Sequence, residues 1–573
     1  MAENSGKRWT LASSAIESCS DQKDWGISPL SIQILQNRGI TEPSQARHFL
    51  APALSDLPDP FLMKGMRAAV SRIICAIRKQ EKIILFGDYD VDGTTAISLL
   101  LLFLREAGAR VDFYLPHRLK EGYGLNLQAV KKIKEDGTNL LITADCGVSN
   151  LTEISWAREN GLDVIISDHH EMPEAVPPAL AVLNPKQKDC PYPFKGLAGV
   201  GVVYNLVIAL RRILREEGLW KDGTGPNLKG YLDLVALGTV SDVVPLTGVN
   251  RVLAKHGLLQ LSRSTRPGIC ALREIANLGE APVDTAAVHF RFAPRMNAAG
   301  RLGDSASVVR LLVSENEDEA RGIANQLNDL NMERQRVEEG ILSEARRMVE
   351  AFPDLQNRKT LVLASAEWHP GVIGIVASRL TEEFHRPTIL IAIKENMGKG
   401  SGRSIGSFSL YEALKSCEPW MERFGGHEQA VGLAIAPQAI PDFSRAFEEI
   451  ACARLRSEDL VPSLTLDAFA SLEQMDESFL SELESLAPFG MGNPEPVVGL
   501  KDLTVVESRP VGKNHLRLRV QEGRIIRDAI GFRMAPLHPL KQKRVSMAFS
   551  PRINLYQGRR TLQLKILDLQ ERE

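Results

Sequence analysis

In Lys82-Ile-Ile-Leu-Phe86-Gly-Asp-Tyr-Asp-Val-Asp-Gly93, a short apolar run passes directly into an acidic turn. Such a run is typical of a buried strand, and the helix-like segment 94–105 follows the turn. Further strand candidates, each separated from the next by a helical segment, lie at 111–115, 139–143 and 163–167. Strands that alternate with helices predict an α/β fold with a mainly parallel, doubly wound sheet.

Acidic and imidazole side chains follow the apolar runs at the points where those runs end. The first acidic turn contributes Asp88, Asp90 and Asp92, and the later runs are followed by Asp145, by His169 and His170, and by Asp242. The carboxyl ends of strands line the ligand crevice of an open α/β sheet. If each of these runs is a strand, the acidic and imidazole groups gather in one place.

A cluster of carboxylates repels itself unless cations neutralise it. Oxygen ligands with one or two imidazoles suit Mn²⁺ or Mg²⁺, whereas thiolates would suit Zn²⁺ better. Two such ions a few ångströms apart are a common device for phosphoryl hydrolysis. A single DxDxDG sequence also occurs in ordinary turns and helix caps. It resembles an EF-hand loop too, but Ser98 occupies the position of the terminal Glu, and a strand candidate precedes the turn.

The remainder of the chain has a different character. A stripe of apolar residues over 314–353 predicts one long helix or two stacked ones, with Ser314 and Glu317 as a capping box. A second, smaller α/β region follows, and period-two alternation from about residue 460 predicts a small β-barrel. With 573 residues the chain is long enough for several domains. The expected divisions are 1–60, 61–313, 314–353, 354–455 and 456–573.

Charge is balanced over the whole chain but not at its C-terminal end. There are 69 Lys and Arg against 71 Asp and Glu overall, whereas residues 501–573 contain sixteen Lys and Arg against seven Asp and Glu. Basic strands with interspersed aromatic side chains are typical of barrels that bind a single nucleic-acid strand. The candidates are Lys513, Arg517, Arg519 and Tyr556, although a charged face can also serve solubility alone.

Several motifs together resemble the RecJ branch of the DHH phosphoesterase superfamily. DYDVDG, TADCG, SDHH and LGTVSDVVPL occur in the expected order between residues 87 and 246. Supporting motifs are YLPHR at 114–118, PRMNAAGR at 294–301, SGRS at 401–404, FGGH at 424–427 and PFGMGNPEP at 488–496. The resemblance covers roughly residues 60–570. Val431 departs from the more usual Ala.

The resemblance implies a DHH catalytic domain and a DHH-associated domain joined by a long helix, followed by a C-terminal OB-fold. It also implies 5′→3′ hydrolysis of single-stranded DNA to 5′-mononucleotides with two Mn²⁺ or Mg²⁺ ions, in DNA recombination and repair. By motif position the implied metal ligands are Asp90, Asp92, Asp145, His169 and Asp242. His170 lies in or beside the site, Asp88 is a ligand or supporting partner, and Asp233 competes with Asp242.

The same resemblance implies positions that bind the substrate. Arg118, Ser401 and Arg403 would hold the 5′ phosphate, Arg295 and Arg301 would hold backbone near the cut, and His427 would approach the scissile phosphate. The alternatives are surface arginines without a ligand and a turn histidine. In the crevice that we expect between the two α/β regions, only one strand would fit.

Two other function classes remain open from the residues alone. One is a phosphoesterase for short oligonucleotides, cyclic dinucleotides or pyrophosphate, and the other is a scaffold that binds nucleic acid without cleaving it. The long connector and basic barrel favour the longer substrate, and the intact Asp and His positions favour an enzyme. We also expect a cytoplasmic monomer with no membrane segment. Single-strand-binding protein and a RecQ-type helicase are partners expected by resemblance.

Overall fold

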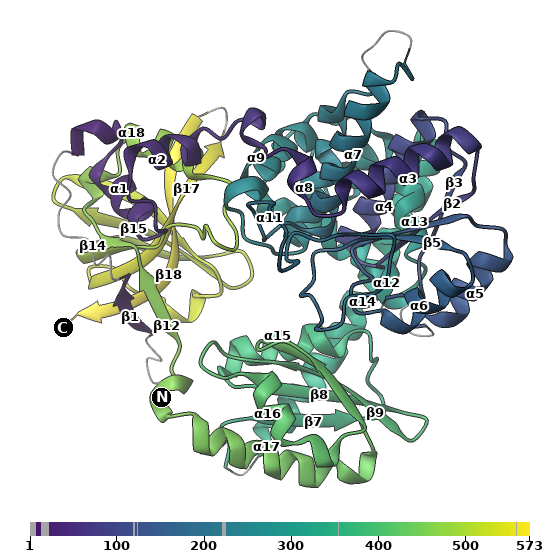
Figure 1. The fold of residues 1–573 in the computed structure, drawn as a ribbon. Helices are drawn as coiled ribbons and strands as arrows, with labels where there is room; N and C mark the ends of the chain where they lie inside the picture. The colour runs from purple at the N-terminus through teal and green to yellow at the C-terminus, as the bar shows by residue number, and fades with distance from the viewer. Residues whose placement is uncertain are drawn as a thin grey trace. The chain divides into compact units, whose positions relative to one another are not determined.

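The computed structural model describes residues 7–12, 22–117, 121–122, 124–220, 225–352, 354–556 and 559–572. Contacts divide the chain into two compact units. The first comprises Met1–Asn297, Ser305–Ala324 and Leu464–Glu573, and the second comprises Ala298–Asp304 and Asn325–Ser463. Each unit is described by itself below, with the element labels of Figure 1.

A parallel five-stranded sheet forms the centre of the first unit. Its strands, in the spatial order β3-β2-β4-β5-β6, are β3 (Val111–Tyr114), β2 (Ile83–Gly87), β4 (Leu140–Ala144), β5 (Asp163–Ser167) and β6 (Ala181–Leu183). The chain order reverses between β2 and β4, which is where open α/β sheets bind ligands. The predicted α/β sheet is thus confirmed, with β6 as a strand that the sequence pattern did not indicate.

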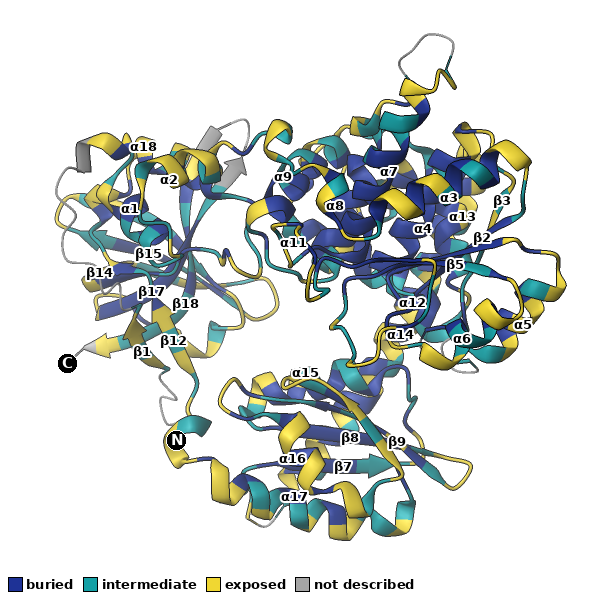
Figure 2. Ribbon diagram, viewed as in Figure 1, coloured by how far each residue is buried: buried dark blue, intermediate teal, exposed yellow. Residues whose placement is uncertain are grey.

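Helices cover both faces of this sheet, as Figure 1 shows. α5 (Leu127–Glu135) and α6 (Leu151–Glu159) pack together on one face, and α3 (Met66–Lys79), α4 (Val91–Glu106) and α7 (Gly199–Glu216) lie on the other. Because both faces are covered, the central strands are buried along their lengths, in dark blue in Figure 2. This burial explains why their sequences are continuous apolar runs rather than alternating ones.

A helical extension follows the sheet. It contains α8 (Leu232–Ser241), α9 (Gly248–Ser262), α10 (Pro267–Ile275), α11 (Thr285–Ala287), the π-helix η5 (Val288–Phe292), α12 (Ala293–Leu302) and α13 (Ala306–Val313). The long connector is a single helix, α14 (Glu317–Glu350). Its cap differs from the expected Ser314–Glu317 box, because Asn316 Oδ1 accepts from the Glu319 N–H and Ser314 Oγ donates to the Glu319 carboxylate.

The second unit contains a mixed sheet in the spatial order β10-β11-β9-β8-β7. The strands are β7 (Leu361–Ser365), β8 (Thr388–Lys394), β9 (Met397–Arg403), β10 (Arg423–Gly426) and β11 (Ala430–Ile435), and the helices are α15 (Ile373–Phe384), α16 (Leu410–Ser416) and α17 (Ile440–Arg454). Only β7 and β8 are parallel; β9, β10 and β11 pair antiparallel.

The C-terminal strands close into a five-stranded barrel. They are β14 (Val498–Val511), β15 (His515–Glu522), β16 (Ile525–Gly531), β17 (Arg544–Tyr556) and β18 (Arg559–Arg572), and pairing of β14 with β17 closes the circle. The predicted period-two alternation is present in β15, where Leu516, Leu518 and Val520 are buried. N-terminal residues join the barrel's core, among them Trp25 and Leu35. The helices α1 (Pro29–Gln36), α2 (Pro43–Leu50) and α18 (Glu477–Leu486) belong to the same unit.

None of the helices in the described ranges is long and apolar enough to cross a membrane.

Candidate metal and catalytic site

The turn after β2 places three carboxylates around the start of α4. Asp90 caps this helix, and its Oδ1 accepts from the Gly93 N–H at 3.0 Å. A Cβ on Gly93 would lie 2.5 Å from the carbonyl oxygen of Asp88. The turn therefore requires glycine at this position, because the backbone folds back against itself.

Asp92 connects the first turn of α4 to the start of α7. Its side chain is buried, and its two oxygens accept from the Gly199 N–H at 2.6 Å and the Val200 N–H at 2.9 Å. These N–H groups belong to the N-terminus of a helix, where a negative charge is stabilised. The contact fixes the Asp92 carboxylate against the start of α7.

Asp145 follows β4 in an unusual backbone conformation, with φ of +64°. Asp tolerates this left-handed region better than most residues do. A Cβ on Gly199 would lie 2.7 Å from the Asp145 Cβ, so the start of α7 approaches Asp145 as closely as glycine permits. The same helix terminus therefore positions both Asp92 and Asp145.

The two histidines follow β5 and are oriented by different partners. His170 Nδ1 lies 2.7 Å from Asp168 Oδ1, and Asp168 also accepts from the Val148 N–H. His169 forms its hydrogen bond with the backbone of Leu197. The supporting role of Asp168 was not predicted, although its place in the DHH triplet was a signal that could have indicated it.

Asp242 reaches the cluster from a helix, which corrects the expectation that each apolar run ends a strand. It is the C-cap of α8, and its N–H donates to the Gly238 carbonyl. Residues 232–240 of α8 are all buried. A helix that is buried all round shows no amphipathic period, so its sequence cannot be distinguished from that of a buried strand.

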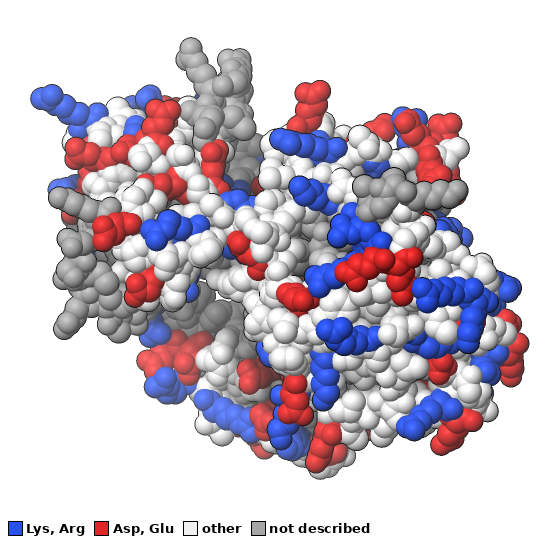
Figure 3. Space-filling view, turned by 45° about the horizontal axis from the view of Figure 1, so that its top comes forward, with Lys and Arg blue, Asp and Glu red and all other residues white. Residues whose placement is uncertain are grey.

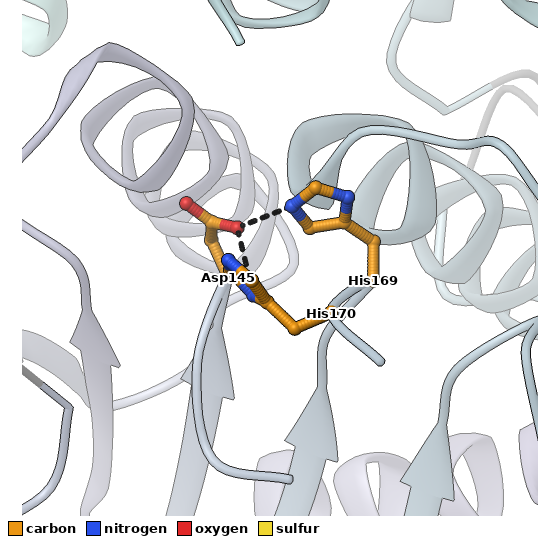
Figure 4. Close-up of side chains that lie close together, drawn as sticks. All are labelled: Asp145, His169 and His170. Atoms are coloured by element: carbon orange, nitrogen blue, oxygen red, sulfur yellow. Dashed lines mark ion pairs between the residues drawn. The ribbon is translucent and has the colours of Figure 1, made fainter. Parts of the chain in front are cut away.

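These side chains converge on one point at the carboxyl edge of the sheet. His169 Nε2 lies 3.1 Å from Asp145 Oδ1, 3.5 Å from Asp242 Oδ2 and 4.0 Å from Asp92 Oδ2. Figure 4 shows both histidine rings beside the Asp145 carboxylate. Three overlapping triads have ligand atoms within 4.8 Å of one another: Asp145, His169 and His170; Asp92, His169 and Asp242; Asp88, Asp90 and Asp145.

Burial and mutual repulsion make ionisation of the carboxyl groups unfavourable without cations. Burial, followed by the charge of Asp90, raises the pKa of Asp92 to about 7. Burial and the nearby Asp92 and Asp90 raise the pKa of Asp242 to about 9, and the pKa of Asp145 also rises well above its usual value. Burial lowers the pKa of His169 to about 4, so its ring is neutral at pH 7.

The ligand atoms of this cluster fit divalent cations that prefer oxygen ligands. Neither His169 Nε2 nor Asp242 Oδ2 has a hydrogen-bond partner among the described residues, although both atoms are buried. When the other ring nitrogen of His169 carries the proton and donates it to the Leu197 backbone, Nε2 is unprotonated. Its lone pair then points toward the lone pairs of the carboxylate oxygens. Acceptors that face one another in this way require a cation between them.

Asp233, the competing candidate, lies outside this cluster. It is buried in the first turn of α8, where Ser264 Oγ donates to Oδ2 at 2.8 Å and Arg266 Nε donates to the same oxygen at 3.2 Å. Its charge is thus compensated by an arginine. The side chain supports the fold of the helical extension.

The predicted phosphate-binding residues of the second unit lie at the N-terminus of α15. Arg403 Nη1 donates to Ser401 Oγ at 3.3 Å, and both residues belong to β9. A Cβ on Gly374, in the first turn of α15, would lie 2.9 Å from Ser401 Oγ and 3.3 Å from Arg403 Nη2. His427, in the same unit, is exposed beyond the end of β10.

Arg295 and Arg301 both belong to α12. Arg295 donates to the carbonyls of Arg291 and Ile275, and Arg301 Nη1 donates to the Gly371 carbonyl at 3.0 Å. Arg118 lies outside the described residues.

The candidate binding residues of the barrel differ in their exposure. Lys513 and Arg519 are exposed, whereas Arg517 is half-buried and its Nη2 donates to Asp528 Oδ1 at 3.2 Å. This ion pair reduces the charge that Arg517 offers to a ligand. The Tyr556 side chain lies outside the described part of the chain.

Three family models match successive parts of the chain. The model described as "DHH family, N-terminal domain" matches residues 82–239, "DHHA1 domain" matches residues 357–452, and "RecJ OB domain" matches residues 466–568. The single-stranded-DNA-specific exonuclease RecJ of Bacillus subtilis is 40% identical over 550 residues, covering 95% of this chain and 68% of that protein.

The chain belongs to the RecJ family. The RecJ structure from Thermus thermophilus in complex with Mn²⁺ has a TM-score of 0.82 and 32% identity, and the match covers 99% of this chain and 80% of that one. The complex of the same RecJ with Mg²⁺ has a TM-score of 0.76 and 30% identity, covering 99% and 79%. The predicted combination of a DHH domain, a DHH-associated domain and an OB-fold barrel is thereby confirmed as the RecJ architecture.

Proposed function

We propose that this protein is a metal-dependent exonuclease that hydrolyses single-stranded DNA from its 5′ end and releases 5′-mononucleotides. The convergence of Asp88, Asp90, Asp92, Asp145, His169 and Asp242 carries this proposal, because such a set is suited to two divalent cations. Its relatives are named single-stranded-DNA-specific exonucleases. We further propose a role in recombination and repair.

Mn²⁺ or Mg²⁺ bound by these six residues would supply positive charge that polarises the phosphoryl group and acidifies water. The chain's own groups would orient the reaction. Asp92 and Asp145 are held by the start of α7, and Asp168 holds His170 through Nδ1. Water then attacks phosphorus, the bond to the 3′ oxygen breaks, and the leaving oxygen takes a proton. His170 is proposed to supply that proton, and His427 is proposed to approach the scissile phosphate.

The distribution of charge over the molecule supports attraction of DNA to particular groups rather than to the surface as a whole. Figure 3 shows Lys and Arg interspersed with Asp and Glu over one face, in agreement with the balanced totals of 69 and 71. We therefore propose that binding depends on particular groups. These are Arg118, Arg295, Arg301, Ser401 and Arg403 for the strand's phosphates, and Lys513, Arg517, Arg519 and Tyr556 of the barrel for the remainder of the strand.

The decisive experiment uses a single strand labelled at either end, with Mn²⁺, beside a blunt duplex and the Asp90→Ala/Asp92→Ala double variant. We expect progressive release of mononucleotides from the 5′ end, an intact duplex and an inert variant. Cleavage restricted to di- or trinucleotides would instead indicate a small-substrate phosphoesterase. Binding of the strand without cleavage would indicate a scaffold.

End recognition has a separate test. Arg403→Ala should reduce the preference for 5′-phosphorylated over 5′-hydroxyl strands more than it slows cleavage, because a guanidinium binds phosphate through paired hydrogen bonds. An equal loss on both substrates would contradict this role for Arg403.

We also propose that the protein acts as a cytoplasmic monomer with single-strand-binding protein and a RecQ-type helicase as partners. Family resemblance supports this proposal. Light scattering of the purified protein tests whether it is a monomer. Co-sedimentation with each purified partner tests whether the two proteins bind.

A further inference from the structure

Phe290 is an apolar side chain that the folded protein leaves in solvent. Its exposed fraction is 78%, the highest among the exposed large hydrophobic side chains of the described residues. Phe290 occupies the middle of the π-helix η5, between α11 and α12. Single exposed hydrophobic residues are ordinary on protein surfaces, so exposure alone assigns no role.

The segment that carries Phe290 is held firmly. Val288 and Phe292, at the two ends of η5, are completely buried, which leaves the residue midway between them facing outward. Asp284 Oδ1 accepts from the Ala287 N–H at 2.7 Å and caps the preceding turn. The ring is therefore presented on a fixed support, and π-turns of this kind occur frequently at functional sites.

Two arginines fasten the same segment through hydrogen bonds to backbone carbonyls. Arg291 Nη1 donates to the carbonyls of Ala276 and Asn277, at 3.1 and 3.4 Å. Arg295 Nη1 donates to the Arg291 carbonyl at 2.7 Å. Carbonyl oxygens carry no net charge, so these bonds do not neutralise Arg291, which is an exposed residue.

A second aromatic ring lies beside Phe290, and a cationic residue, Arg291, follows Phe290 directly in the chain. The His289 ring lies edge-on to Phe290, with 6.4 Å between the centroids. Burial lowers the pKa of His289, so at pH 7 it is a second neutral ring. Exposed aromatic faces beside a cation are the groups that bind single strands, through base stacking and phosphate contact. The π-helix packs against α8, the helix whose C-cap is Asp242.

We propose that Phe290 is a base-stacking contact for the single strand and that Arg291 binds the adjacent phosphate. This inference rests on the proposed function, because it takes single-stranded DNA as the ligand. It adds a contact on the catalytic domain to those proposed for the barrel and the second unit. Base stacking is indifferent to sequence, so the contact should be sequence-independent.

The test measures binding by fluorescence anisotropy in chelator, which prevents hydrolysis. The probes are a single strand and an equally long strand of abasic residues. Phe290→Ala should weaken binding of the normal strand by about 5- to 150-fold, the range expected for one base stack. It should leave binding of the abasic strand unchanged. Phe290→Trp, which keeps an aromatic face, should bind like the wild type.

Leu259→Ala is the matched control, because Leu259 is also exposed but lies on α9. It should bind both strands like the wild type. Unchanged binding by Phe290→Ala, or an equal loss on both strands, would overturn the stacking role while wild-type digestion of single strands still supports the proposed function. If the wild type neither binds nor digests single strands, the proposed function itself fails.

Discussion

Asp168 carries the carboxylate on which the orientation of His170 depends. Burial alone would raise the pKa of Asp168, but its hydrogen bonds with His170 and the Val148 N–H hold that pKa below its usual value. The side chain therefore stays ionised and fixes the ring through Nδ1. Carboxylates that orient imidazole groups in this way are commonly needed for full metal affinity.

Asp168→Asn should lower Mn²⁺ affinity or the cleavage rate by about 10- to 100-fold, because the amide orients the imidazole less firmly. Calorimetric titration with Mn²⁺, followed by rate measurement at saturating metal, separates the two effects. Glu171→Gln is the control, since the Glu171 carboxylate binds Lys186 at the surface. If Asp168→Asn binds Mn²⁺ and cleaves DNA as the wild type does, His170 does not depend on the Asp168 carboxylate for its orientation.

At the scale of elements, β9 shows how tertiary packing overrides local propensity. Its sequence MGKGSGR suggests a flexible loop, yet it pairs with both β8 and β11. A Cβ on Gly400 would lie 2.7 Å from Leu433 Cγ. The alternate glycines of this strand make room for large neighbouring side chains. The packing gained in this way outweighs the conformational entropy that the glycines lose when they are ordered.

Gly400→Ala should therefore destabilise the second unit by about 1–3 kcal/mol through overpacking. Urea denaturation followed by circular dichroism measures the change. Gly432→Ala is the matched control, because Gly432 pairs with Ser401 in the neighbouring strand and its nearest neighbour would be 4.0 Å away. Equal destabilisation by both variants would mean that the loss of glycine itself, rather than crowding, is responsible.

Glu495 links two strands of the barrel through charge. Arg552 of β17 donates to its Oε1 at 2.5 Å, and Lys565 of β18 donates to Oε2 at 3.2 Å. Burial would raise the pKa of Glu495, but these two cations hold it below its usual value. A lowered folded-state pKa contributes stability that is present above the unfolded-state pKa and is lost as the pH falls through the folded-state value.

Glu495→Gln should thus be less stable than the wild type at pH 7. The difference should shrink as the pH falls below the usual range of a glutamate, because protonation removes the same charge from the wild type. Urea midpoints across this pH range measure the effect. A difference that stays constant with pH would indicate hydrogen bonding or packing in place of charge.

At the scale of the whole molecule, Arg251 joins distant parts of the first unit. It lies on α9 and is buried, and its guanidinium donates to the carbonyls of Phe49, Ser485, Ala487 and Pro488. Burial lowers its pKa to about 9. One side chain therefore holds α2 and the end of α18 against the catalytic domain. The five-segment division expected from the sequence stays a prediction.

Arg251→Met should destabilise the protein by about 2–4 kcal/mol, because it keeps the apolar stem but leaves buried carbonyls without donors. Thermal and urea denaturation measure the loss. Arg263→Met, at the exposed C-cap of the same helix, should change stability by less than about 0.5 kcal/mol. A loss for Arg251→Met as small as that of the control would show that these carbonyls find other partners.

The sequence by itself determined the alternation of strands and helices, the positions of the acidic turns and the outward face of the barrel strands. Each of these follows from neighbours along the chain, because strand burial and period-two alternation leave a local pattern. It also placed Asp88, Asp90 and Asp145 at strand ends, where sheet geometry brings side chains together.

Only the tertiary structure decided what depends on residues far apart in sequence. Asp242 joins the cluster from a buried helix, Asp92 is fixed by the start of α7, and Arg251 binds carbonyls more than two hundred residues away. Such contacts leave no period in the local sequence, since they are created by packing between elements. The same reason explains Phe290, whose exposure depends on how the π-helix is anchored rather than on its neighbours in the chain.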